Sequence, residues 1–302
     1  MTQNKLEYTY QNPSEPLHDP SVFRVSASQI HNFTHQTSEW YRKNVLGEKM
    51  ETCTALVLGT SLHYLGQKYS ENNTIADEDR EEIYDYIILN KSELVDEPEI
   101  RSQLTAMWPK LKGHLELNPV QLSEVTAISK LPNGMTFGGK IDAIRTLDGS
   151  NPTCLEDLRG QSVELIDYKT TSALNPPKTV LQAYKHQLYV YSLALKREYN
   201  ITASIASIIY ITKAQTNRYG VVKKDGTRNK LADNPPKVAE VKVSIDEPAL
   251  EFIESLINLV ADSVQMFIEN PTMRYALMQD GRYRDNNTTL PFKVGNQTEL
   301  EI

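Results

Sequence analysis

The chain has little cysteine, no long hydrophobic run and no excess of positive charge. Its only cysteines are Cys53 and Cys154, too few for a disulfide framework, a four-cysteine zinc site or a four-cysteine iron–sulfur cluster. No stretch approaches the roughly 18–20 apolar residues that a membrane-spanning helix requires. The polar start of the sequence also lacks the basic and apolar segments of a signal peptide. We therefore expect a reduced, cytoplasmic protein that makes no membrane contact.

The charge balance is acidic, with a formal net charge of -7 and a pI near 5.5. A protein that coats nucleic acid along its whole surface is expected to be strongly basic, so this class is excluded. Carboxylates that hold metal ions add negative charge, and a local basic patch then has to supply any phosphate contacts. The 39% hydrophobic content over 302 residues is enough for a sizeable core.

Composition divides the chain into three parts. Residues 1–25 are polar and rich in proline, which predicts an N-terminal arm. Residues 26–270 form the main domain, mainly helical over 26–117 and of mixed α/β character over 120–270. Residues 271–302 follow Asn270-Pro271, a helix-ending pair, and are predicted to be a C-terminal tail.

Periodicity predicts the elements of the main domain. A helix is expected to begin at Ser26–Ile30, and further helices are expected at 53–69, within 77–117, at 179–199 and at 249–268. Strands are expected at 124–128, 136–144, 163–168, 203–212 and 239–245, with a polar loop at 147–160. This order favours an α/β fold in which helices flank a short mixed β-sheet.

Two predicted strands carry charged residues among apolar neighbours. Asp167 and Lys169 project to the same side of one strand because side chains alternate with period two. Tyr168 points the other way, but its backbone carbonyl is free to act as an oxygen ligand. Asp142 closes the run Gly138–Ile141 on a strand expected to pair with the first. Buried charges are costly unless they are paired or bound to metal.

The predicted convergence of Asp142 and Asp167 indicates a metal site. Oxygen ligands without a cysteine or histidine cluster suit Mg²⁺, or Mn²⁺, better than zinc. Such an ion can activate a water molecule and polarise a phosphate. The Lys169 ammonium group would orient that water or neutralise charge that develops on the phosphate.

These residues resemble the PD-(D/E)XK nuclease superfamily, and within it the RecB-like and exodeoxyribonuclease VIII (RecE-like) branch. The resemblance covers about residues 26–200. Four segments match family motifs in the family's order: Leu58-Gly59-Thr60-Ser61-Leu62-His63, Gly139-Lys140-Ile141-Asp142, Ile166-Asp167-Tyr168-Lys169-Thr170 and Gln187-Leu188-Tyr189-Val190-Tyr191. No Walker A pattern is present, so ATP-driven activity is not expected.

The resemblance implies a restriction-endonuclease-like core and a role for each matched residue. Metal ligation is implied for His63, Asp142, Asp167 and the Tyr168 carbonyl, with Glu124 as a further acidic position near the metal. Catalytic roles are implied for Asp142, Asp167 and Lys169, supported by Gln187 and Tyr191. The last two are four residues apart, so they share one helical face from which they can hydrogen-bond phosphate oxygens or the lysine.

A basic segment over residues 213–237 is the predicted DNA contact. It holds seven Lys or Arg against two Asp, among them Lys213, Arg218, Lys223, Lys224, Arg228 and Lys230. Glycine and proline mark it as a loop or hairpin, which suits contact with the phosphate backbone. Tyr219 in the same segment could stack on an exposed base. A solvated surface loop is the competing interpretation.

The leading hypothesis is a Mg²⁺-dependent exonuclease that acts on double-stranded DNA ends in recombination or repair. By resemblance, it would digest 5′→3′, form a ring-shaped homo-oligomer, work with a single-strand annealing protein, and belong to a phage or mobile element in a bacterial cytoplasm. Two alternatives stay open. One is an endonuclease or single-strand-specific nuclease of the same fold, and the other is a DNA-binding module that does not cut.

Overall fold

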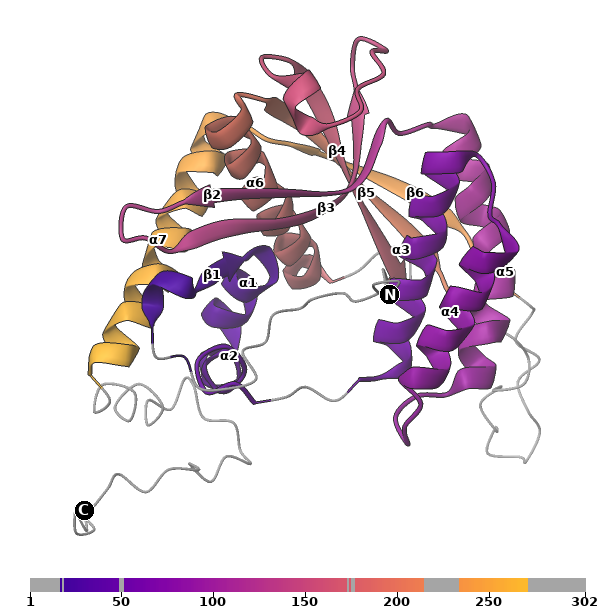
Figure 1. Cartoon of the computed structure of the whole chain (residues 1–302), viewed down its shortest axis with the longest axis horizontal. Coiled ribbons are helices and arrows are strands. Elements are labelled where there is room, and N and C mark those ends of the chain that lie inside the picture. Colours follow the sequence, from indigo (N-terminus) through magenta and orange to yellow (C-terminus); the bar gives the residue numbers. More distant parts are fainter. Residues whose placement is uncertain are drawn as a thin grey trace.

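A mixed six-stranded β-sheet lies between two groups of helices (Figure 1). The computed structural model describes residues 17, 19–48, 52–172, 174, 177–214 and 234–270. The strands are β1 (Arg24–Ser26), β2 (Leu122–Lys130), β3 (Thr136–Thr146), β4 (Ser162–Thr171), β5 (Thr202–Thr212) and β6 (Val238–Ser244). They are ordered β1-β3-β4-β5-β6, with β2 also paired to β3. The predicted α/β class with a mixed sheet is confirmed.

The helices separate onto the two faces of this sheet. They are α1 (Ala27–His35), α2 (Thr37–Asn44), α3 (Thr54–Asn72), α4 (Asp77–Leu89), α5 (Glu97–Leu117), α6 (Lys178–Tyr199) and α7 (Glu247–Glu269), with short 3-10 turns η1 (Pro20–Val22) and η2 (Leu155–Leu158). Helices α1, α2, α6 and α7 share one hydrophobic core with the sheet, and α3, α4 and α5 share the other. The sheet is therefore covered on both sides, as Figure 1 shows.

Strand β4 is the centre of this arrangement because its side chains enter both cores. Leu165 belongs to the core that contains α6, whereas Ile166 and Tyr168 belong to the core that contains α3. The strand pairs antiparallel with β3 and parallel with β5. The sequence of a strand buried on both faces is a nearly continuous apolar run. In β4 this run is interrupted by Asp167 and Lys169, whose charges therefore lie between the two cores.

Several elements differ from the predictions. Strands β3 and β4 continue past their expected ends, so Asp142 and Asp167 lie inside strands and do not close them. The expected helical stretch 77–117 is broken into α4 and α5, and the loop 147–160 contains η2. Tertiary packing overrides local sequence at these places, since strand ends depend on the neighbouring strand.

Helix α2 was not predicted, because its sequence is mostly polar. Its Trp40 and Tyr41 are nevertheless buried. Both rings contact Phe267 of α7, with ring centroids 6.4 and 5.3 Å away. Helix α2 is therefore stabilised by the packing of two aromatic side chains against a helix that is distant in sequence. A segment this short contains no hydrophobic periodicity from which the helix could be predicted. The division of the chain into arm, domain and tail stays a prediction.

Gly138 gives a direct test of the sheet geometry. Its φ is +130°, and a Cβ atom there would lie 2.1 Å from the carbonyl oxygen of Ala127 on β2. We predict that Gly138→Ala lowers the free energy of unfolding by at least about 2 kcal/mol, because it adds both backbone strain and a clash with β2. Urea unfolding followed by circular dichroism measures this loss.

The matched control is Gly113→Ala in α5, where a Cβ would meet no atom within 4 Å. A helical alanine there should raise the free energy of unfolding by roughly 0.5–1 kcal/mol. Equal stability of the two variants would contradict the close approach of β2 and β3 at Gly138.

Candidate active site

The strand register lines up three acidic residues on neighbouring strands. Ser123 pairs with Ala143 and Val125 with Ile141, so Glu124 lies opposite Asp142. Ala143 pairs with Ile166 at the end of the β3–β4 ladder, so Asp142 and Asp167 are the next residues of the two strands beyond it. Like charges directly opposite each other destabilise a sheet. The three carboxylates on β2, β3 and β4 are therefore stable together only with positive charge nearby, which His63, Lys140 and Lys169 supply.

Strands β3 and β4 separate at this point. Their ladder ends at the pair Ala143 and Ile166. Beyond it, the side-chain Oδ2 of Asp142 accepts a hydrogen bond of 2.8 Å from the backbone N–H of Tyr168. The carboxylate thus takes the place of a backbone acceptor from β3, which fixes its orientation between the two strands.

Glu124 has a strained backbone, with φ +55° in a strand. Positive φ is uncommon for a residue other than glycine, and strain of this kind concentrates at functional sites. Its carboxylate Oε2 lies 2.5 Å from the Nζ of Lys140, and the Glu124 side chain is almost fully buried. Lys140 was not predicted as a site residue, because the motif that contains it gives no reason to assign it a role.

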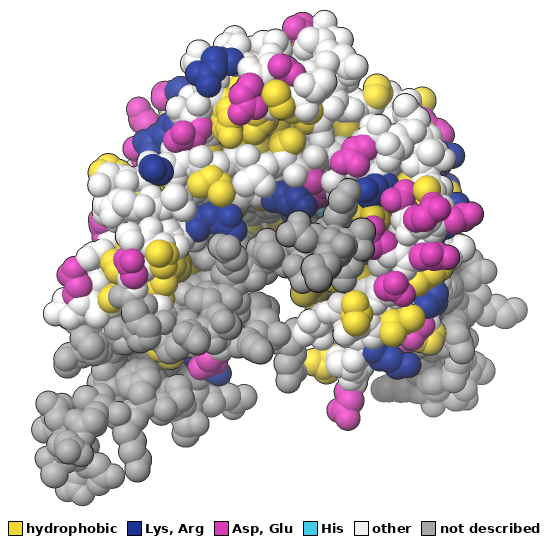
Figure 2. All heavy atoms as spheres, viewed as in Figure 1, with side chains coloured by type: hydrophobic (Ala, Val, Ile, Leu, Met, Phe, Trp, Pro, Cys, Tyr) yellow, Lys and Arg dark blue, Asp and Glu magenta, His cyan; other side chains and the backbone are white. Residues whose placement is uncertain are grey.

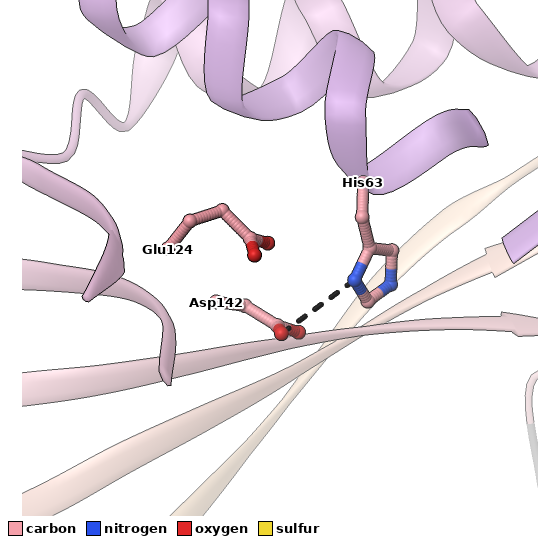
Figure 3. Close-up of side chains that lie close together, drawn as sticks. All are labelled: His63, Glu124 and Asp142. Carbon is pink, nitrogen blue, oxygen red and sulfur yellow. Dashed lines mark ion pairs between the residues drawn. The ribbon is translucent and has the colours of Figure 1, made fainter. Parts of the chain in front are cut away.

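His63 extends from α3 toward the two acidic side chains of the sheet (Figure 3). Its Nδ1 lies 3.5 Å from Oδ1 of Asp142. One ligand atom each from His63, Glu124 and Asp142 lies within 4.8 Å of the others. Figure 3 shows the two carboxylates side by side with the imidazole facing them. Among the described residues, this is the only group of three such side chains that meets this spacing.

Lys169 lies beside this group and is held by α6. Its Nζ donates to Oδ1 of Asp167 at 2.7 Å and to Oε1 of Gln187 at 3.1 Å. The amide nitrogen of Gln187 donates in turn to the Tyr191 hydroxyl at 3.0 Å. A Cβ at Gly139 would lie 3.0 Å from the Tyr191 ring, so a glycine is needed where this ring packs on β3. The hydrogen bond between Lys169 and Asp167 confirms the prediction that their side chains lie on the same side of the strand.

Burial and mutual repulsion shift the protonation of these acids. Burial raises the pKa of Asp167 to about 6; Lys169 opposes this shift, and Asp142 adds to it. Burial and Asp142 likewise raise the pKa of Glu124. Burial would raise the pKa of Asp142 as well, but the charge and hydrogen bond of His63 outweigh it and lower that pKa.

The pKa values of the basic partners His63 and Lys169 are also raised. Burial opposes the positive charge of His63, yet Asp142 and Glu124 outweigh burial and raise the pKa of His63 to about 9. Burial also disfavours the Lys169 ammonium group, and Asp167 with Asp142 overcomes this to raise its pKa. Three carboxylates thus lie beside three basic groups, His63, Lys140 and Lys169, and the burial of so many charges in one place is costly even when they are paired.

These residues fit a divalent cation. Oδ2 of Asp167 is buried and has no hydrogen-bond partner among the described residues. A buried oxygen without a partner costs free energy unless an ion or water satisfies it. Carboxylate oxygens with one imidazole are donors that Mg²⁺ and Mn²⁺ accept. The predicted ligation by the Tyr168 carbonyl stays a prediction.

The predicted DNA contacts lie elsewhere in the chain. Lys213 follows β5, and its Nζ is 3.7 Å from Oε1 of Glu99 on α5. The remaining predicted contacts are outside the described residues: Arg218, Lys223, Lys224, Arg228 and Lys230. Their role stays a prediction, as do the roles of the metal-site and catalytic residues.

A sequence profile of the PD-(D/E)XK nuclease superfamily matches residues 24–265. The chain belongs to this superfamily. The matched range includes every described strand and both helical layers. The family resemblance of the motifs is thereby confirmed, and the restriction-endonuclease-like α/β core with it. A comparison with curated protein sequences finds no match.

Three solved structures are similar to this PD-(D/E)XK chain. The "Putative exonuclease" of Eubacterium rectale is 12% identical, with 89% of this chain and 87% of that chain covered and a TM-score of 0.52. LHK-Exo in complex with dAMP is 12% identical, with 76% and 100% covered and a TM-score of 0.33. A phage related exonuclease from Haemophilus somnus 129PT is 10% identical, with 82% and 96% covered and a TM-score of 0.35. At 12% identity, the similarity to the Eubacterium rectale structure shows that the two chains share a fold.

Within the described residues, no helix combines the length and apolar character needed to cross a membrane. This agrees with the sequence, in which charged residues interrupt every apolar run.

The raised pKa of His63 predicts a pH dependence of stability in the metal-free protein. The histidine titrates near its ordinary value of 6.5 when unfolded and near 9 when folded. Its charged form therefore stabilises the fold fully below pH 6.5, and this contribution is lost as the pH rises through 9. We expect the melting temperature, measured with a chelator present, to fall between pH 6.5 and 9.

His63→Gln is the control, since an amide does not titrate. In this variant the melting temperature should change little across the same pH window. A wild-type profile that is equally flat would contradict the His63–Asp142 contact.

Proposed function

We propose that the chain is a divalent-metal-dependent DNA exonuclease that hydrolyses phosphodiester bonds from duplex ends. The observation that supports this most is the convergence of Glu124, Asp142 and His63 next to the pair Asp167 and Lys169. Carboxylates that can hold a divalent ion, beside a lysine ammonium group, supply groups that can promote phosphate hydrolysis.

Each residue has a distinct part in the proposed reaction. Glu124, Asp142, Asp167 and His63 would hold Mg²⁺ or Mn²⁺, which when bound supplies an activated water and neutralises charge on the phosphate. Lys169 would keep its ammonium group directed at the attacking water or the phosphate. Gln187 fixes that ammonium group through its Oε1, and Tyr191 fixes the Gln187 amide.

The distribution of charge agrees with a polyanionic substrate. In Figure 2, Asp and Glu side chains are densest over the region of α4, whereas the sheet side carries Lys and Arg side chains with some acidic ones among them. Helix α4 alone has three acidic residues in its first turn. The phosphate backbone would therefore approach over the sheet and avoid the acidic helices.

Exonuclease action is preferred to endonuclease action because the motifs resemble the RecB-like and exodeoxyribonuclease VIII branch. The Eubacterium rectale protein of similar fold also carries the name exonuclease. Recombination or repair, a phage setting, a homo-oligomer and an annealing partner belong to the same proposal. Digestion of a linear duplex, but not of a closed circle or a single strand, would separate this proposal from its two nuclease alternatives.

The direct test uses a linear duplex labelled at either end. With Mg²⁺ the protein should release labelled nucleotides, and excess chelator should stop the release. Asp167→Asn and Lys169→Ala should each lower kcat at least about a hundredfold, because each removes a group that acts on the transition state. Comparison of 5′ and 3′ labels gives the direction of digestion.

Matched controls remove the same chemical groups from exposed positions. Asp148→Asn lies in the loop after β3 and Lys110→Ala on the exposed side of α5, so both should cut at the wild-type rate. Tight DNA binding without any turnover by the wild type would favour the non-cutting module. Normal cutting by Asp167→Asn and Lys169→Ala would refute the proposed site.

Salt dependence tests the predicted basic segment. If Lys223 and Lys224 each contact a phosphate, replacing both with glutamine should reduce the slope of log binding constant against log salt by up to about 2. Fluorescence anisotropy with a labelled duplex and Ca²⁺ measures the slope. The same change at exposed Lys91 and Lys110 should leave it unaltered. Equal slopes for all three proteins would mean that the segment is a solvated loop.

A further inference from the structure

Lys169 has a third neighbour that no motif assigns. Its Nζ lies 4.9 Å from the centroid of the Tyr184 ring, over the ring face. An ammonium group within about 6 Å of a ring face is attracted by the ring quadrupole, and more strongly when the pair is shielded from water. The Lys169 side chain is 17% exposed and Tyr184 is half-buried, so water screens this contact only in part.

The geometry shows what the ring adds. A lysine has three N–H donors, and those of Lys169 engage Asp167 and Gln187 on two sides. The Tyr184 ring covers a further side of the ammonium group. Since lysine is a flexible chain with several rotatable bonds, two hydrogen bonds alone leave it able to swing, and the ring restricts this motion.

The ring itself is supported from the sheet. Tyr210 of β5 is the register partner of Lys169 on β4. It is fully buried, and its ring centroid lies 6.2 Å from that of Tyr184 at an interplanar angle of 50°. Tyr184 is thus held between a buried aromatic side chain and the ammonium group, which suits a fixed wall better than a mobile surface residue.

Helix α6 presents Tyr184 with the residues already assigned to Lys169. Positions 184, 187 and 191 have the i, i+3, i+7 spacing of a single helical face. This helical face therefore carries the Tyr184 ring and the Gln187 amide, which contact Lys169, and the Tyr191 hydroxyl, which accepts a hydrogen bond from Gln187. In the sequence, Tyr184 is one of several apolar positions of this helix. Its contact with the lysine depends on how α6 packs on the sheet.

We propose that Tyr184 is a positioning residue that holds the Lys169 ammonium group in place through its ring face. The consequence for cutting rests on the proposed nuclease function, whereas the contact itself does not. The ring face, and not the hydroxyl, carries the effect, so Tyr184→Phe should behave as the wild type and Tyr184→Leu should not.

The first arm of the test is independent of activity. In metal-free protein labelled with ¹³C at the lysine ε carbon, the Lys169 signal is the one missing from Lys169→Arg. Protons above an aromatic ring are shifted upfield, so this signal should lie upfield in the wild type and in Tyr184→Phe. It should return to the ordinary lysine position in Tyr184→Leu.

The second arm measures cutting of the end-labelled duplex with Mg²⁺. Tyr184→Leu should lower kcat by about twofold to thirtyfold, the range expected for one cation–π contact, with KM nearly unchanged. Tyr184→Phe should restore the wild-type kcat. This rescue by a ring without a hydroxyl separates positioning from general loss of packing.

Tyr189→Leu is the matched control, because Tyr189 is another half-buried tyrosine of α6 that packs against the same core. It should lose comparable thermal stability while both its Lys169 signal and its kcat stay at wild-type values. An unchanged Lys169 signal in Tyr184→Leu would overturn the proposal, as would a full kcat in that variant. If no protein cuts DNA, the nuclease proposal fails, and the spectra still decide whether Tyr184 holds Lys169.

Discussion

The structure depends on one electrostatic constraint, the burial of three neighbouring carboxylates where β3 and β4 separate. Asp142 repels both Glu124 and Asp167, and burial together with this repulsion raises the pKa of Asp167 to about 6. Within the described residues, His63, Lys140 and Lys169 pair with these carboxylates. Burying so many charges is costly even when they are paired, and the proposed divalent cation would offset part of this cost.

The two hydrophobic cores provide the rigidity that this constraint requires. Helix α6, which packs in one core, holds Gln187 against Lys169, whereas α3, which packs in the other core, presents His63. Strand β4 contributes to both cores, so a shift of either helical layer would alter the distance between the imidazole and the ammonium group. The site is therefore a product of the whole three-layer packing and not of one loop.

The sequence predicts which segments are helices and strands and which charged residues form the site. It predicts less well how these segments pack together and which side chains come into contact. Period-two alternation predicts that Asp167 and Lys169 share a side, and motif spacing predicts the helix that carries His63. The positive φ of Glu124 and the hydrogen bond from Tyr168 N–H to Asp142 depend on how β3 leaves β4, which no local pattern encodes. The same holds for α2, whose aromatic residues are stabilised by α7, and for Lys140, whose partner Glu124 lies on another strand.

The most direct test of the central claim is the position of a bound ion in crystals grown with Mn²⁺, found by anomalous diffraction. We expect a peak between His63, Glu124, Asp142 and Asp167, with oxygen ligands at about 2.0–2.3 Å, beside the Lys169 ammonium group. A protein saturated with Mn²⁺ whose only peaks lie outside this group of side chains would contradict it.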